Sequence, residues 1–251
     1  MSVTEDLAAS YRILADHCVI DAYGHVSVRS SENPDRYLMA RALAPELVTE
    51  DDIVELDLDS NLIGKSGVSI YKERFIHGEI YKLLPEVNAV VHNHSPSVIP
   101  FGVTPDQPLR GMFNTGAFIA EGVPIFEIRD FQGSGDLMVR NRELGRALAE
   151  TIGDKPAALM RGHGAVVVAN SLPVVVARSI YLEMSSKLQA QAMMIAGPGG
   201  RITYLDEIEA EVMIARQDYE RAWHLWRTKA VERLRAEKAR RAAKGSSNSS
   251  E

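Results

Sequence analysis

The sequence predicts an α/β fold in which helices cover a central sheet. Two observations carry this prediction: apolar residues recur at helical spacing in several segments, and short β-branched runs separate those segments along the 251-residue chain. The first helix is expected over residues 4–20, where Leu7, Tyr11 and Leu14 share one face. Alternating residues then predict a strand over 25–29.

The remaining elements alternate in the same way and are expected to share one core. Strands are expected over 53–58, 89–92, 125–128, 157–160 and 165–169, and helices over 71–84, 114–121, 137–152, 173–195 and 206 to about 240.

The end of the chain differs in composition. From Lys229 it is a run of mixed basic and acidic residues, and from Gly245 it is small and polar. We expect a catalytic domain over 1–228, then a charged helical extension and a disordered tail over 229–251. The extension has no aromatic residues among its cations and carries glutamates, so an RNA-binding patch is not expected.

Composition excludes several classes of function. A formal charge of −6 gives no general attraction to nucleic acid or to an anionic membrane. The single cysteine, Cys18, cannot form an internal disulfide, and the N-terminus lacks a secretory-signal pattern. No apolar run approaches the ~20 residues that span a bilayer. The expected setting is soluble, reducing and cytoplasmic, with neither nucleic acid nor membrane as a partner.

The segment 88–96 is the strongest indication of chemistry. Its β-branched run places His92 and His94 two residues apart on one face of a strand, and two imidazoles that point the same way form half of a metal site. A pair of core or solvent-facing histidines is the plainer alternative. The apolar run 89–91 favours a buried strand, in which histidines need partners.

His163 is the best candidate for a third ligand. Gly162 and Gly164 flank it between two apolar strands, and glycine on both sides allows a tight turn that brings the imidazole close to another group. The alternative is a hairpin that His163 merely decorates. With the other two histidines it favours a catalytic metal site, because three neutral imidazoles leave a divalent ion at least one open position.

An acidic residue precedes the histidine strand. Apolar residues at helical spacing predict a helix over 71–84, which Pro85 ends. Glu73 lies in its first turn, where a carboxylate suits the helix dipole even without another role. His77 follows one turn later and is expected to pack in the core or to support a ligand, since three histidines already suffice.

These residues together resemble the class II aldolase/adducin family, and the resemblance covers roughly residues 5–226. The matching motifs are Glu73 with His77, His92-Asn-His94, His163 in its Gly-rich turn, and the loop Gly24-His-Val-Ser27. The resemblance implies a three-layer α/β/α domain whose central sheet is mainly antiparallel.

The family's metal site is carried to this chain by the same resemblance. It implies that His92, His94 and His163 bind one divalent ion per subunit, with zinc, manganese, cobalt and iron(II) all open. Glu73 then completes the coordination, acts as acid or base, or does both. A homotetramer with sites at subunit borders is also implied.

The reaction is harder to predict, because the family's reactions share an enolate or equivalent intermediate that the metal stabilises. The aldolases of the family hold a sugar phosphate with small hydroxyl residues in three loops. The matching segments here are 24–27, 38–45 and 71–72, which introduce bulk and the cations Arg41 and Lys72. A phosphate monoester is therefore not expected, whereas Arg41 suits a carboxylate. A plain surface arginine is an equally open interpretation of Arg41.

Two further features favour a decarboxylase. Phe113 lies near the position of a proton-donating tyrosine of the aldolases, and it has no hydroxyl. The motifs Gly-His-Val-Ser-Val-Arg and Ala-Arg-x-Leu-Ala-Pro resemble the branch with decarboxylases of hydroxylated aromatic or pyridine dicarboxylates. We expect a carbon–carbon lyase acting on such a carboxylate, with His25 and Arg41 gripping a second carboxylate.

Two alternatives remain. The first is a metal aldolase that cleaves a non-phosphorylated hydroxy-keto acid. The second, an adducin-like binding module, is disfavoured because all three histidines and Glu73 are present. The aromatic stripe Tyr219, Trp223 and Trp226 is expected to serve packing or a subunit interface rather than a substrate box.

Overall fold

The computed structural model describes residues 2–64 and 67–247. Within these residues, eight strands form a sheet with the order β4-β3-β2-β1-β5-β8-β7-β6. Neighbouring strands are antiparallel except β6 and β7, which are parallel. The strands are β1 His25–Arg29, β2 Arg36–Ala40, β3 Ile53–Asp57, β4 Leu62–Ile63, β5 Ala89–Asn93, β6 Ile125–Phe126, β7 Ala157–Met160 and β8 Gly164–Ala169.

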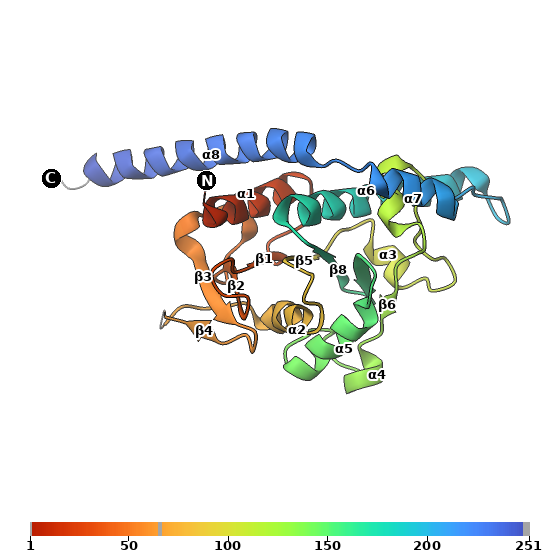
Figure 1. Cartoon of the computed structure of the whole chain (residues 1–251), viewed down its shortest axis with the longest axis horizontal. Helices are drawn as coiled ribbons and strands as arrows, with labels where there is room; N and C mark the ends of the chain where they lie inside the picture. Colours follow the sequence, from red (N-terminus) through yellow and green to blue (C-terminus); the bar gives the residue numbers. More distant parts are fainter. Residues whose placement is uncertain (1, 65–66, 248–251) are drawn as a thin grey trace.

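Helices cover both faces of this sheet (Figure 1). Helices α1 (Val3–Asp16), α6 (Leu172–Ala196) and α8 (Glu220–Ser247) lie on one side, and α2 (Phe75–Leu83) and α5 (Arg142–Ile152) lie on the other. The expected three-layer α/β/α fold with a mainly antiparallel sheet is therefore confirmed. The shorter helical segments are η1 Pro45–Leu47, η2 Glu50–Asp52, η3 Lys72–Arg74, α3 Ile99–Gly102, η4 Asn114–Ile119, α4 Arg129–Gln132 and α7 Glu207–Ala215.

The central strands position the histidines. Every residue of β5 and of β8 is buried, as expected for apolar strands that helices cover on both faces. β5 lies between β1 and β8, and the register places His92 opposite His25 on β1 and opposite Val166 on β8. Residues from three segments that are distant in sequence therefore meet at one end of β5.

Two expected helices near the site have different bounds. The segment expected over 137–152 becomes helical only at α5, because Leu137 adopts φ = +63° and the Asn141 side chain caps the helix at the Leu144 N–H. The helix expected over 71–84 begins instead as the 3-10 segment η3, within which Glu73 has the non-helical φ and ψ of −91° and 17°, and regular helix starts at α2. Glu73 therefore lies just before the regular helix.

Other differences have local causes. The helix expected from 206 to about 240 is two helices, because the Asp218 carboxylate accepts a hydrogen bond from the Glu220 N–H and starts α8 anew. Strands β2 and β4 were not expected; β2 is rich in residues that favour helices, and its pairing with β1 and β3 overrides that preference. The helix expected over 114–121 is the 3-10 segment η4.

Helix α8 lies along α1 and extends beyond it (Figure 1). Arg12, on α1, forms an ion pair with Glu237, and Arg227 pairs with Glu5 and Asp6. The helix continues through Ser247, past the Gly245 at which a disordered tail was expected, and residues 248–251 of that tail lie outside the described residues.

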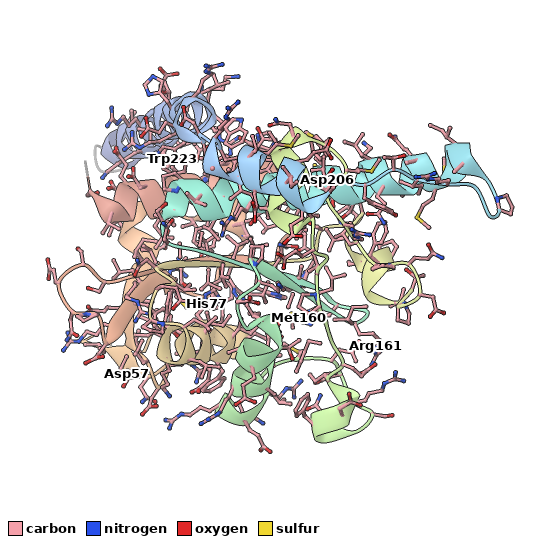
Figure 2. All side chains as sticks on the ribbon, turned by 45° about the vertical axis from the view of Figure 1, so that its right-hand side comes forward. Asp57, His77, Met160, Arg161, Asp206 and Trp223 are labelled. Atoms are coloured by element: carbon pink, nitrogen blue, oxygen red, sulfur yellow. The ribbon has the colours of Figure 1, made fainter. Side chains whose placement is uncertain are left out.

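The aromatic stripe of α8 and the segment before it packs within the chain. Trp226 contacts the rings of His17 and Tyr181 at 5.0 and 6.4 Å, and Tyr219 stacks on Tyr181 at 6.1 Å. Trp223 is half-buried on α8 (Figure 2). Across the residues that the structure describes, no helix combines the length and the apolar character needed to cross a membrane.

Candidate metal centre and active site

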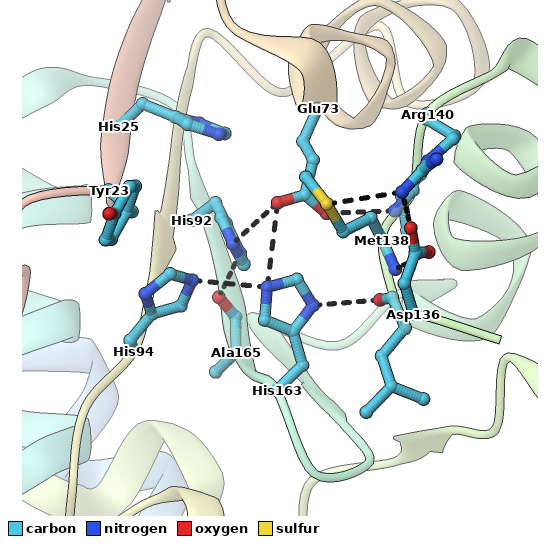
Figure 3. A network of polar contacts seen from close by, with 12 residues as sticks. Tyr23, His25, Glu73, His92, His94, Asp136, Met138, Arg140, His163 and Ala165 are labelled. Atoms are coloured by element: carbon cyan, nitrogen blue, oxygen red, sulfur yellow. Dashed lines mark hydrogen bonds and ion pairs between the residues drawn. The ribbon is translucent and has the colours of Figure 1, made fainter. Parts of the chain in front are cut away.

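His92 and His94 lie together at the end of β5 (Figure 3). His92 is in the strand and fully buried, whereas His94 follows the strand with 19% of its side chain exposed. Their ring centroids are 5.0 Å apart. The His-x-His spacing thus brings both imidazoles to one place, as the alternation of a strand requires.

His163 reaches the same place through the turn between β7 and β8. The backbone N–H of His163 donates to the Met160 carbonyl, and Gly162 occupies the turn with φ = +66°. A Cβ on Gly164 would lie 1.9 Å from the Asn93 carbonyl oxygen, so only glycine lets β8 approach β5 here. The His163 ring centroid is 4.9 Å from that of His92. The flanking glycines therefore bring this histidine to the other two.

The three histidines present the same ring nitrogen to their common centre. Each Nδ1 lies near an oxygen that can only accept: Ala165 O for His92 at 3.2 Å, Asp21 Oδ1 for His94 at 3.1 Å, and Leu137 O for His163 at 3.0 Å. The proton of each neutral imidazole therefore belongs on Nδ1, which leaves Nε2 free to bind a metal.

The spacing of the free nitrogens fits a divalent ion. Nε2 of His94 and Nε2 of His163 are 3.2 Å apart, and the ligand atoms of the three histidines all lie within 4.8 Å of one another. Ligands about 2.0–2.1 Å from a tetrahedral ion are about 3.3 Å apart. His92 Nε2 is buried and has no hydrogen-bond partner among the described residues. A metal ion would satisfy this nitrogen, so the donor set and its geometry fit the expected group.

Glu73 lies beside this cluster. Its Oε2 is 3.7 Å from His92 Nε2 and 3.6 Å from His163 Nε2, and its Oε1 accepts a hydrogen bond from the Val139 N–H at 2.9 Å. Burial raises the pKa of Glu73 to about 7, although the Val139 N–H and the Arg140 guanidinium act in the opposite direction. The carboxyl group is therefore placed either to complete the coordination or to exchange a proton with a bound molecule.

Burial also favours the neutral form of His92 and His163. It lowers the pKa of His163 to about 4, with a smaller contribution from His94, and it lowers the pKa of His92 well below the usual value. Neutral imidazole is the form that binds metal.

The two residues expected to hold substrate differ in their placement. His25 is buried next to the cluster, 5.0 Å from His92 and 4.7 Å from Tyr71 between ring centroids. Arg41 directly follows β2, where its Nε donates to Asp52 at 2.7 Å. The Arg41 side chain is 42% exposed. The structure thus brings His25 to the clustered histidines, whereas the Arg41 side chain is paired with Asp52.

Sequence reasoning missed the residues that orient the site. Asp21 supports His94, and the loop between α4 and α5 supplies both the Leu137 carbonyl and the Val139 N–H. Arg140 in the same loop pairs with Asp136 beside Glu73 (Figure 3). The positive φ of Leu137 is the clearest sign of a loop held in place, and no sequence pattern revealed it.

A cleft of about 1010 Å³ lies elsewhere, between α6, α7 and η4. Arg110, Arg178, Asp206 and Tyr219 are among the residues that line it, and none of the clustered histidines does. The chemistry of the donor set, rather than the size of a cavity, therefore locates the site.

Comparison with known proteins identifies the family of this protein. Residues 5–190 match the family described as Class II Aldolase and Adducin N-terminal domain. The chain belongs to the class II aldolase/adducin family. Residues 5–190 include all three clustered histidines, Glu73 and His25.

The named relatives include decarboxylases. The chain is 36% identical over 236 residues to decarboxylase tropJ of Talaromyces stipitatus, covering 85% of this chain and 88% of that protein. It is 30% identical to a 3,4-dihydroxyphthalate decarboxylase of Arthrobacter keyseri, covering 77% and 79%. The family and these relatives show that the protein is an enzyme, a carbon–carbon lyase.

Solved structures show the same fold. An aldolase II superfamily protein from Pseudomonas syringae has a TM-score of 0.75 at 22% identity, with 92% of each chain covered. L-fuculose 1-phosphate aldolase from Glaciozyma antarctica has a TM-score of 0.72 at 24% identity, covering 95% of this chain and 90% of that one.

Proposed function

We propose that this protein is a metal-dependent decarboxylase of a hydroxylated aromatic or pyridine carboxylate or dicarboxylate. The observation that supports this most is the convergence of three free Nε2 atoms and the buried Glu73 carboxyl in a chain whose relatives include named decarboxylases. Three of the relatives are named for 3,4-dihydroxyphthalate, which carries a ring hydroxyl next to a carboxylate.

The geometry supports the following roles. His92, His94 and His163 hold one divalent ion, and Glu73 is close enough to be a fourth ligand. When bound, the ion supplies Lewis acidity to a ring hydroxyl and an adjacent carboxylate of the substrate. Zinc, manganese, cobalt and iron(II) are all compatible with this donor set.

The remaining steps are loss of carbon dioxide from the ring and protonation of the ring carbon. The bond between the ring carbon and the carboxylate breaks, carbon dioxide departs, and its bonding electron pair remains on the ring. Glu73, or a water molecule that it holds, delivers the proton that this carbon requires. His25, which contacts the His92 ring, would bind the substrate beside the metal, and Arg41 is a candidate for a more distant carboxylate once it leaves Asp52.

The assembly and setting belong to the same proposal. A homotetramer with sites at subunit borders agrees with the apolar side chains exposed near the end of α6 and on α7: Met194, Ile195 and Ile208 are 78%, 88% and 73% exposed. We also expect residues 229–251 to form a charged extension of the catalytic domain, and the protein to work in a reducing, cytoplasmic setting.

The test is product analysis on purified protein. Apoprotein reconstituted separately with zinc, manganese, cobalt or iron(II) is supplied with ortho-hydroxy aromatic and pyridine dicarboxylates, and carbon dioxide, aldehyde and pyruvate are measured. Metal-dependent carbon dioxide from a ring acid supports the proposal. Aldehyde or pyruvate without carbon dioxide would instead indicate an aldolase for a non-phosphorylated hydroxy-keto acid. Silence in every assay would favour a binding module.

A further inference from the structure

A chain of buried polar side chains runs from the core to the metal cluster. His25 Nδ1 lies 2.7 Å from His77 Nε2, His77 Nδ1 lies 2.6 Å from Ser27 Oγ, and Ser27 Oγ lies 2.7 Å from the Tyr81 hydroxyl. Figure 2 shows His77 on α2, in the interior of the molecule. All four residues are at most 2% exposed.

Two simple spacings in the sequence bring these four side chains together. His25 and Ser27 are two residues apart on β1 and therefore point to the same face of the sheet. His77 and Tyr81 are four residues apart on α2 and share the face that packs on that strand. The metal site already described does not use Ser27, His77 or Tyr81.

The direction of the hydrogen bonds is fixed at the inner end. Within the described residues, the Tyr81 hydroxyl has one hydrogen-bond partner, Ser27 Oγ. Burial raises the pKa of Tyr81 far above its usual value, so the phenol keeps its proton. If Tyr81 accepted from Ser27, this buried proton would have no acceptor, which is a costly arrangement. Tyr81 therefore donates to Ser27.

The remaining donors follow in order. Ser27, having accepted from Tyr81, directs its own proton to His77 Nδ1. Burial lowers the pKa of His77 to about 3, so its ring is neutral and its single proton lies on Nε2. That proton is donated to His25 Nδ1. A neutral His25 ring then carries its proton on Nε2, the opposite tautomer to that of the three clustered histidines.

We propose that Tyr81, Ser27 and His77 are positioning residues that hold His25 as an Nε2–H donor beside the metal, where it hydrogen-bonds a substrate oxygen. Although the ligand atoms of His25, Glu73 and His92 lie within 4.8 Å of one another, a protonated Nε2 cannot bind the metal. His25 therefore acts on the substrate and not as a ligand. Its donor suits a carboxylate or ring hydroxyl, and this substrate role rests on the proposed function.

The tautomer can be measured without turnover. Long-range proton–nitrogen NMR spectra of zinc-loaded protein labelled with ¹⁵N-histidine report which nitrogen of each ring carries the proton. His25→Asn and His77→Gln assign the signals. We expect a bare Nδ1 and a protonated Nε2 for His25, and a mixture of tautomers in Tyr81→Phe. A protonated Nδ1 in the wild type, or no change in Tyr81→Phe, would overturn the proposal.

Tyr37→Phe is the matched control. The Tyr37 ring lies 5.4 Å from that of Tyr81 and 6.2 Å from that of His77, but its hydroxyl bonds to Ser60 and to the Arg74 carbonyl instead. The Tyr37→Phe substitution therefore removes a buried hydroxyl from the same layer and leaves the hydrogen bonds between Tyr81, Ser27, His77 and His25 unchanged. We expect Tyr37→Phe to show the wild-type tautomer of His25, and a change equal to that of Tyr81→Phe would contradict the proposal.

Binding of 2-hydroxybenzoate to the zinc-loaded protein, measured by calorimetry, tests the donor role. We expect affinity to fall about tenfold in Tyr81→Phe and in His77→Leu with zinc content unchanged, and to recover in His77→Gln, whose amide both donates and accepts. Equal affinity in all variants would overturn the donor role. Because neither readout requires a reaction, failure of the decarboxylase assay would remain distinguishable from failure of this proposal.

Discussion

Asp21 is predicted to set the affinity of the site for its metal, and the change to test is Asp21→Asn. Asp21 Oδ1 accepts from His94 Nδ1 at 3.1 Å, and it is the one side chain among the three groups that orient the clustered histidines, since Ala165 and Leu137 use backbone carbonyls. Partners of this kind are worth about 10- to 100-fold in metal affinity. Asp21 is 54% exposed, so solvent screening places the loss near the lower limit.

The expected loss is therefore about tenfold in the zinc dissociation constant, or about 1.4 kcal/mol. It is measured by competition between the apoprotein and a chromophoric chelator. Asp106→Asn is the control, because Asp106 lies exposed in the loop after α3 and is not among the groups that accept from the Nδ1 atoms of the clustered histidines. Unchanged affinity in Asp21→Asn, or an equal loss in Asp106→Asn, would refute the reasoning.

Three further predictions concern stability and metal binding. Zinc at a thousandfold excess over its dissociation constant should raise the free energy of unfolding by about 4 kcal/mol, seen as a higher Tm, and His92→Ala should abolish the rise; a rise that survives in His92→Ala would place the metal elsewhere. Gly164→Ala should lower the free energy of unfolding, measured in urea, by about 1–3 kcal/mol, because its Cβ would lie 1.9 Å from the Asn93 carbonyl oxygen. Gly102→Ala should lower it by less, because the nearest atom to its Cβ would be the Met160 carbonyl oxygen at 3.5 Å. Arg12→Leu should cost about 2–3 kcal/mol, because Arg12 is 3% exposed and bonds to Glu237 and the Val48 carbonyl. Arg146→Leu, which breaks an exposed pair with Glu150, should change stability by less than about 0.5 kcal/mol, and equal losses would show that α8 docking does not depend on Arg12.

The sequence predicted the parts of the site that follow from local periodicity. One residue, Asn93, separates His92 from His94, and glycines mark the turn that carries His163, so the clustering of these histidines could be predicted before the fold was known. The resemblance then supplied the order of the layers and the place of Glu73. These features depend on short-range spacing, which a single sequence records directly.

The parts that could not be predicted depend on tertiary packing. Asp21 meets His94 across 73 residues, and the Leu137 carbonyl meets His163 only because the loop before α5 crosses the site. Arg41 has the right chemistry for a carboxylate, but its ion pair with Asp52 occupies its Nε. The direction of the donors from Tyr81 to His25 likewise arises only once α2 packs on β1.

The most direct test of the central claim is decarboxylation in D₂O, comparing the wild type with Glu73→Gln. We predict that metal-loaded wild-type protein releases carbon dioxide from a hydroxylated aromatic dicarboxylate and yields a product with one deuterium at the vacated ring carbon. Glu73→Gln should keep its metal and lose at least 100-fold in kcat, since general acid catalysis contributes about 10²- to 10⁴-fold. Carbon dioxide released by metal-free protein, or at the wild-type rate by Glu73→Gln, would contradict the account.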